Sequence, residues 1–221
     1  MNDYLVTDLD GTLYFDDVES LDELLFKMSS KYKVVLATGR HLEDFDLYFS
    51  EKIKKYFEFM VFLNGAIVVK NNKTYYNTIE REIVEKIKIQ QWIRGMVVYE
   101  LTDGNRVEEC LLRECNYGDV LRIHAYTNEM SDDYVWNINV ANALGMQIYT
   151  DSIRHLVLYS KQVNKYIISN RFINSDNGKM VKVIGNGLND LSLMVNIKNS
   201  EMLFLNDLDK CEAVRLIEEF I

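Results

Sequence analysis

Two carboxylates near the start of the chain have the type and the spacing that bind a divalent cation. Asp8 and Asp10 lie in the segment 8–12 (DLDGT), directly after an apolar run at 4–7. Alternate residues of an extended chain point the same way, so both carboxylates can face one pocket. Paired anions repel unless a cation lies between them, and a hard cation such as Mg2+ prefers oxygen ligands. The segment therefore predicts a magnesium site, and Gly11 allows a sharp turn after it.

Two further polar segments also follow predicted strands. Residues 37–40 (ATGR) offer a hydroxyl and backbone N–H groups at the start of a helix, which suits a phosphate group. An ordinary helix N-cap also explains this segment. Residues 185–190 (GNGLND) combine two glycines with amide and carboxylate side chains, which suits an anion or a metal and equally a tight loop.

The elements that position these segments alternate between strand and helix at both ends of the chain. Apolar runs predict strands at 4–7, 33–37, 59–63, 181–184 and 202–205. Helical spacing predicts helices at 21–29, between Gly39 and about Lys55, at 190–195 and at 207–220. This alternation predicts an α/β fold with a Rossmann-like, doubly wound parallel sheet. Ligands of such sheets bind beyond the carboxyl ends of the strands, where the three polar segments lie.

The middle of the chain follows a different pattern. Strands are predicted at 96–102, 108–115, 121–127, 146–150 and 155–160, and helices at 79–92 and 131–144. This is an α+β module, and the parallel alternation resumes only after it. We therefore predict a core domain of residues 1–77 and 156–221 and an inserted α+β cap domain of residues 78–155.

Together the three polar segments resemble those of the haloacid dehalogenase superfamily. More closely, they resemble its Cof-like branch (subclass IIB) of sugar-phosphate phosphatases, which carries an α+β cap after the third strand. Asn64, at the end of the third predicted strand, also fits this branch. The segment 163–165 resembles the one that carries the lysine of the family, so Lys165 is preferred to Lys161. The resemblance covers the whole chain.

The resemblance implies a phosphatase that forms an aspartyl phosphate. Asp8 would be the covalent nucleophile. Asp10 would be the general acid for the leaving alcohol and then the base for water. Lys165 would neutralise charge between the nucleophile and the phosphate. The groups that hold the phosphoryl oxygens would be Thr38, Gly39, Lys165 and Asn189.

The resemblance also implies Mg2+ as the cofactor. The expected ligands are Asp8, the backbone carbonyl of Asp10, Asn186 and Asp190. The family usually has Asp where this chain has Asn186, whose amide carries no negative charge. We therefore expect weaker magnesium binding than in relatives with Asp at this position.

Four residues are candidates for contact with the substrate or the cap: Arg40, Asn64, Arg122 and His124. Arg40 directly follows the predicted phosphate loop. Arg122 and His124 alternate on one predicted strand, so they can face the same side. An exposed polar strand face explains this pair as well.

Composition narrows the range of partners. A net charge of −9 argues against binding to nucleic acid or to an anionic membrane. No apolar run reaches the roughly 18 residues that span a bilayer, and the N-terminus has no signal pattern. We therefore expect a cytoplasmic protein, monomeric or homodimeric, whose partner is a small phosphorylated metabolite.

Two other functions stay open at this point. A phosphomutase would use the same aspartates to pass the phosphoryl group to another hydroxyl of the same sugar. A binding or regulatory protein would keep the fold with weakened catalysis, and Asn186 is the feature that favours it. Phosphate release from a phosphate ester distinguishes the phosphatase from both.

Overall fold

The computed structural model describes the chain apart from residues 1, 16, 91–95, 102–106, 112–113, 116–118, 127–131, 153–154, 188–189, 191–199 and 207. The chain divides into two compact units. Met1–Tyr75 and Asn164–Ile221 form the core unit, and Tyr76–Val163 forms the cap unit.

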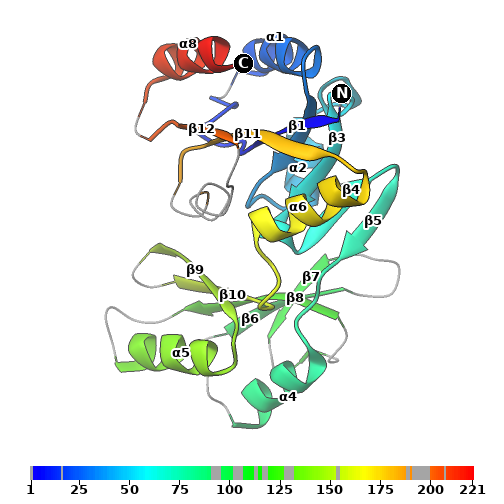
Figure 1. Ribbon diagram of the computed structural model, residues 1–221. Coiled ribbons are helices and arrows are strands. Elements are labelled where there is room, and N and C mark those ends of the chain that lie inside the picture. The colour runs from blue at the N-terminus through cyan, green and yellow to red at the C-terminus, as the bar shows by residue number, and fades with distance from the viewer. Residues whose placement is uncertain are drawn as a thin grey trace. The chain divides into compact units, whose positions relative to one another are not determined.

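Among the described residues, the core unit has one sheet of seven strands (Figure 1). Its strands are β1 (Asp3–Thr7), β2 (Lys33–Ala37), β3 (Phe57–Phe62), β4 (Ile67–Lys70), β5 (Lys73–Tyr76), β11 (Lys179–Gly185) and β12 (Glu201–Phe204). They lie in the order β12-β11-β1-β2-β3-β4-β5. The pairs from β12 to β3 are parallel, and β4 is antiparallel to β3. The predicted α/β class with a Rossmann-like parallel sheet is confirmed.

Helices cover both faces of the core sheet. They are α1 (Val18–Ser29), α2 (Leu42–Tyr48), α3 (Glu51–Lys54), α6 (Lys165–Ser175) and α8 (Lys210–Phe220), with a 3-10 turn, η1, at Leu63–Gly65. α1 and α8 lie together on one face, and α6 lies on the other (Figure 1). Lys27 of α1 forms an ion pair with Glu218 of α8. α6 packs on a cluster that includes Tyr4 and Val6 of β1.

The core unit differs from the sequence prediction in three places, one of which is α6, where no helix was predicted. The single helix expected up to about Lys55 is two short helices, because Phe49 and Ser50 are extended. The hairpin of β4 and β5 was not predicted. It turns at Asn71 and Asn72, whose φ angles are 52° and 58°. Tight hairpin turns require positive φ at both central residues, and Asn tolerates it.

The cap unit combines a five-stranded sheet with two helices among its described residues. The strands are β6 (Met96–Leu101), β7 (Val107–Leu111), β8 (Asp119–Tyr126), β9 (Gln147–Ser152) and β10 (His155–Tyr159), and the helices are α4 (Arg81–Gln90) and α5 (Asp132–Ala143). β10 pairs with β8 and β9. Because this pairing keeps β10 in the cap sheet, the units divide after Val163 and not at the predicted boundary between residues 155 and 156.

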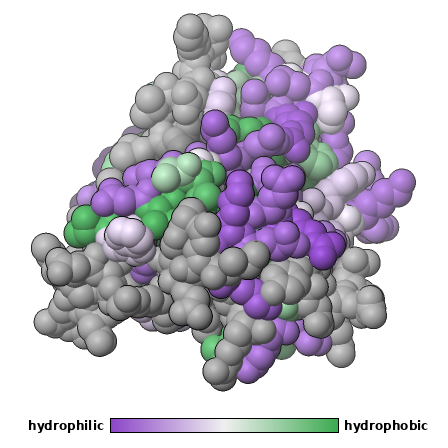
Figure 2. All heavy atoms as spheres, turned by 90° about the horizontal axis from the view of Figure 1, so that it is seen from below, coloured by the Kyte–Doolittle hydropathy of each residue, from purple (hydrophilic) through white to green (hydrophobic). Residues whose placement is uncertain are grey.

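Hydrophilic side chains cover most of the described surface in the view of Figure 2, and hydrophobic side chains form a narrower band among them. A bilayer-spanning helix needs about 20 predominantly apolar residues. Across the part of the chain that the structure describes, no helix has the length and apolarity to span a membrane.

A hydrogen-bond network centred on the Asp176 carboxylate connects three parts of the core unit: β1, β4 and the end of α6. This carboxylate accepts a hydrogen bond from the Tyr4 hydroxyl at 2.8 Å and one from the Lys70 ammonium at 2.5 Å. Burial opposes the charge of Asp176, but Lys70 and Tyr4 outweigh it and lower the pKa of this carboxyl. The network therefore stabilises the fold when Asp176 is ionised.

We expect Asp176→Asn to lower the free energy of unfolding at pH 7 by about 1–3 kcal/mol, because a charged acceptor is lost. A carboxyl with a lowered pKa stabilises the fold above its ordinary pKa, and this contribution disappears as the pH falls through the folded-state value. The difference between wild type and variant should therefore shrink below about pH 4. Urea unfolding at several pH values measures it, and a difference independent of pH would contradict the assignment.

Candidate active site

The carboxyl ends of β11 and β1 lie side by side in the core sheet, second and third from the β12 edge. The strand order reverses here: β2 and β3 follow β1 on one side, and β12 follows β11 on the other. Such a reversal opens a crevice beyond the strand ends, where open α/β sheets bind ligands. The Asp8 N–H donates to the Ile184 carbonyl at 3.0 Å, so Asp8 lies directly at this point.

A buried lysine lies between two carboxylates at the reversal point. Lys165 is the first residue of α6, and its side chain is 0% exposed. Its ammonium donates to Asp8 Oδ1 at 2.8 Å and to Asp190 Oδ1 at 2.7 Å. Burial of these charges is tolerable because each has a partner of opposite sign. The lysine preferred from the sequence thus contacts Asp8, whereas Lys161 is exposed and belongs to the cap unit.

The charge states of this cluster suit a carboxylate nucleophile. Burial raises the pKa of Asp8 to about 6, with Lys165 opposing the rise and Asp190 adding to it. Burial disfavours the charge of Lys165, but the two carboxylates overcome this and raise its pKa above the ordinary value. At neutral pH, Asp8 is therefore mostly ionised beside a positively charged ammonium.

Asp190 also organises the loop after β11. Its Oδ2 accepts hydrogen bonds from the backbone N–H groups of Asn186 at 3.1 Å and Gly187 at 2.9 Å. A Cβ at Gly185 would lie 2.7 Å from the Asp190 Cβ, so only glycine fits there. Both Asp190 oxygens already accept hydrogen bonds, and its role as a metal ligand stays a prediction. Asn189, a predicted phosphate contact, lies outside the described residues.

Asn186 lies against the segment 8–12. Gly11 has a φ of +63°, and a Cβ there would lie 2.3 Å from the Asn186 amide nitrogen. The predicted magnesium ligands Asp8, the Asp10 carbonyl and Asn186 offer only hard oxygen donors, which fits Mg2+. Within the described ranges, no group of three His, Cys, Asp or Glu side chains could hold a metal. A metal here would therefore need the backbone carbonyl and the amide.

The 3-10 turn η1 packs against the predicted phosphate loop at residues 37–40. The Thr38 side chain is buried, and its oxygen accepts a hydrogen bond from the Arg40 N–H at 3.1 Å. The Asn64 N–H donates to the Thr38 carbonyl at 3.1 Å. A Cβ at Gly39 would lie 3.5 Å from the Asn64 side-chain oxygen. Asn64 therefore contacts the loop and helps to shape it, while direct contact with substrate stays a prediction.

The Arg40 guanidinium binds the carboxylate of Asp10, the predicted general acid. Its Nε donates to both oxygens of Asp10, at 3.0 and 2.7 Å, and its Nη2 donates to Oδ1 at 2.5 Å. The guanidinium carbon also lies 5.5–5.8 Å from the ring centroids of Tyr14, Tyr48 and Phe49, within reach of cation–π attraction. No sequence signal predicted this pairing, because the partners are 30 residues apart on separate loops.

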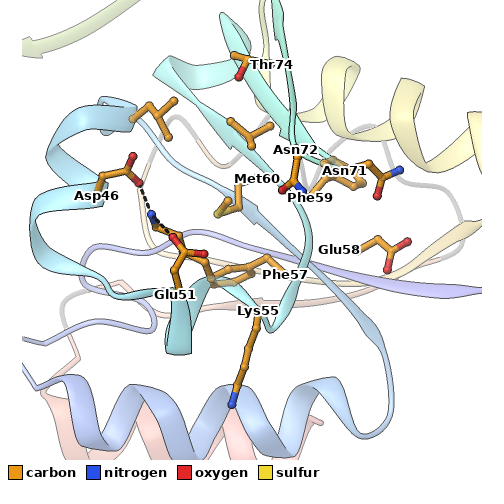
Figure 3. Close-up of a pocket in the computed structure, with 13 residues that line it drawn as sticks. Asp46, Glu51, Lys55, Phe57, Glu58, Phe59, Met60, Asn71, Asn72 and Thr74 are labelled. Atoms are coloured by element: carbon orange, nitrogen blue, oxygen red, sulfur yellow. Dashed lines mark hydrogen bonds and ion pairs between the residues drawn. The ribbon is translucent and has the colours of Figure 1, made fainter.

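Two cavities are lined by described residues of the core unit, and they share no lining residue. One of about 370 Å3 is lined by Tyr14, Arg40, Asp44 and Tyr48, so it adjoins the Arg40–Asp10 pair. The other, of about 510 Å3, is lined in part by Phe57 and Phe59, near the start of β3 (Figure 3). Because the Asp8 site lies beyond the carboxyl ends of the strands, the larger cavity is not part of it.

The two candidate residues of the cap lie on β8. Ile123 and Ala125 belong to the hydrophobic core of the cap unit. Arg122 and His124 alternate with them and therefore project from the other face of the sheet. His124 Nδ1 is 2.7 Å from His155 Nε2, and the ring of Tyr126 stacks on His155 at 4.5 Å. Contact of Arg122 or His124 with substrate stays a prediction.

Similar solved structures cover almost the whole chain. A haloacid dehalogenase-like hydrolase from Bacteroides thetaiotaomicron is 17% identical, with a TM-score of 0.67 and full coverage of both chains. A sugar phosphatase of subclass IIB is 15% identical, with a TM-score of 0.66, over 97% of this chain and 90% of the other. The sucrose-phosphatase of Synechocystis, solved with sucrose and phosphate, is 15% identical, with a TM-score of 0.64, over 99% and 88%. At these identities the likeness establishes the fold.

The sequence comparison agrees with the fold. Residues 5–96 match the family model of the haloacid dehalogenase-like hydrolases. No curated protein matches the sequence significantly. The family match includes the segments 8–12 and 37–40, and the structure brings both to the carboxyl end of the core sheet with Lys165. The predicted resemblance is therefore confirmed: residues 5–96 match this family model, and the chain as a whole has the fold of the haloacid dehalogenase-like hydrolase structure described above.

Proposed function

We propose that this protein is a magnesium-dependent phosphatase that hydrolyses small phosphate monoesters through an aspartyl phosphate on Asp8. The observation that carries the proposal is the contact between the buried Lys165 ammonium and Asp8, at the point where the strand order reverses. A carboxylate attacks an anionic phosphate only where positive charge offsets their repulsion, and Lys165 supplies that charge.

In the first half of the reaction, an Asp8 oxygen attacks phosphorus. The bond from phosphorus to the ester oxygen breaks, and Asp10 donates a proton to that oxygen as the alcohol leaves. The Thr38 oxygen accepts from the Arg40 N–H, so the Thr38 hydroxyl proton is available to a phosphoryl oxygen. Lys165 offsets the charge between Asp8 and the phosphoryl group.

In the second half, water attacks phosphorus and Asp10 takes its proton. The bond from phosphorus to Asp8 breaks, phosphate leaves, and the Asp8 carboxylate is restored. Bound Mg2+, held by Asp8, the Asp10 carbonyl and Asn186, would supply positive charge to the phosphoryl oxygens. Asp190 would keep Lys165 and the loop at 185–187 in place throughout.

We further propose a sugar phosphate or a related metabolite as the substrate. The support is that two structures with this fold are a sugar phosphatase and a sucrose-phosphatase. The net charge of −9 favours a small metabolite over nucleic acid as the partner. A cytoplasmic location and a monomeric or homodimeric state belong to the same proposal.

A screen of phosphorylated metabolites and a generic aryl phosphate tests the function. Each compound is incubated with the full chain and Mg2+, Mn2+ or a chelator, and free phosphate is measured. We expect release that depends on the metal. Formation of an isomeric sugar phosphate without free phosphate would favour the phosphomutase. No turnover of any ester would favour the binding or regulatory protein.

Asn186→Asp is expected to lower the Mg2+ concentration for half-maximal activity by about tenfold, because a carboxylate binds a hard cation better than an amide does. The new charge would lie close to Asp8, so the metal-free variant should also unfold at a lower temperature. Magnesium titrations of activity and metal-free thermal melts measure the two effects. An unchanged or higher magnesium requirement would show that the amide does not limit metal binding.

A further inference from the structure

The smaller cavity lies beside the atoms that the proposed reaction uses. Arg40 contributes to its lining and also forms three hydrogen bonds with Asp10. Tyr14, another lining residue, is joined to the same loop, because the Gly11 N–H donates to its carbonyl at 3.2 Å. The cavity is therefore built partly from the loop that carries Asp8 and Asp10.

The proposed reaction places the alcohol part of the substrate near this cavity. A general acid must lie within about 3.2 Å of the oxygen that it protonates. The carbon skeleton attached to that oxygen then begins next to Asp10 and its partner Arg40. A volume of about 370 Å3 is within the usual range of small-molecule sites.

The lining groups indicate which alcohols would fit. The Asp44 carboxylate accepts hydrogen bonds, the Arg40 guanidinium donates them, and the hydroxyls of Tyr14 and Tyr48 can do both. A second anionic group would be repelled by Asp44, and the charge of Arg40 is already matched by Asp10. An apolar alcohol would leave the polar lining groups without partners from the ligand. Several neutral hydroxyl groups complement the cavity best.

We infer that this cavity of the core unit is the subsite for the alcohol part of the substrate, and that it selects small polyhydroxylated phosphate monoesters through Asp44 and Tyr48. This inference rests on the proposed function. It assigns selection of the alcohol to residues of α2, whereas the candidates from the sequence were Arg40, Asn64, Arg122 and His124.

The same helix offers a matched control. Asp44 and Tyr48 are four residues apart on α2 and therefore share a face. Asp46, only two residues from Asp44, lines the larger cavity instead (Figure 3). Its carboxylate accepts a hydrogen bond from Lys54 at 2.8 Å. Asp44→Asn and Asp46→Asn are thus identical chemical changes, on one helix, at two different cavities.

Binding of phosphonates, whose phosphorus–carbon bond is not hydrolysed, tests the inference without turnover. A hexitol phosphonate carries the hydroxyl groups, and benzylphosphonate carries an apolar group of similar size. Isothermal titration with the full chain and Mg2+ gives the dissociation constant of each. Thermal melts of the variants show that they remain folded.

Asp44→Asn should weaken hexitol phosphonate binding by about tenfold or more, because a hydrogen bond to a charged acceptor is lost. Benzylphosphonate binding should change by less than about threefold. Tyr48→Leu should weaken hexitol phosphonate binding in the same direction, and Asp46→Asn should affect neither ligand. If Asp44→Asn weakened both ligands equally, or neither, the cavity would not be the alcohol subsite.

The experiment separates this inference from the proposed function. Selective loss of hexitol phosphonate binding, in a protein that releases phosphate from no ester, would support the subsite and count against hydrolysis. Phosphate release combined with no selective effect of Asp44→Asn would support hydrolysis and overturn the subsite. Failure of wild type to bind either phosphonate, together with no phosphate release from any ester, would overturn both.

Discussion

Asp8→Asn should reduce phosphate release by about 10^4-fold or more, because an amide cannot form the covalent intermediate. The fold should survive the change. Burial raises the pKa of Asp8, so the site tolerates a neutral group, and Lys165 keeps its bond with Asp190. Acid quenching of wild type during turnover, followed by mass spectrometry, should find a phosphoryl group on the peptide that contains Asp8.

A control on the same strand separates chemistry from folding. Asp3, at the other end of β1, is not part of the site, and Asp3→Asn should leave phosphate release unchanged. Asp8→Asn should lack the phosphorylated peptide while melting within a few degrees of wild type. Residual phosphate release comparable to wild type would place the nucleophile elsewhere.

Lys165→Met is expected to affect both stability and catalysis. Removing the ammonium leaves the carboxylates of Asp8 and Asp190 buried without a counter-charge, which should cost about 3–5 kcal/mol of unfolding free energy without metal. Phosphate release should fall by about 10^3-fold, because no cation then offsets the charge between Asp8 and the phosphoryl group. Metal-free urea unfolding and phosphate assays with Mg2+ measure the two effects.

Two further variants test the cause of the stability loss expected for Lys165→Met. Lys161→Met makes the same chemical change at an exposed position and should alter stability by less than about 0.5 kcal/mol. If uncompensated charge destabilises Lys165→Met, then Lys165→Met/Asp190→Asn should be more stable than the single variant. A double variant no more stable than the single one would assign the loss to packing.

The predictions from the sequence succeeded where chemistry and periodicity are local. The apolar run at 33–37 coincides with β2, and the spacing of apolar residues at 21–29 lies within α1. Each is a property of neighbouring residues, which the printed sequence contains. Positive φ at Gly11 follows from the same local rule. The hairpin of β4 and β5 was not predicted from the sequence, because the exposed residues of β5 show no alternation of apolar and polar types.

By itself, the sequence determined the strand-end segments 8–12, 37–40 and 185–190, the resemblance that they carry, and Lys165 as the preferred lysine. Only the tertiary structure decided the partners of these residues. Lys165 reaches Asp8 across 157 positions and Asp190 across 25, and Arg40 reaches Asp10 across 30. Such pairings depend on the order of strands in the sheet, which long-range packing sets and which no local pattern encodes. The cavity at Asp44 and Tyr48 exists for the same reason, because α2 meets the loop after β1 only in the folded chain.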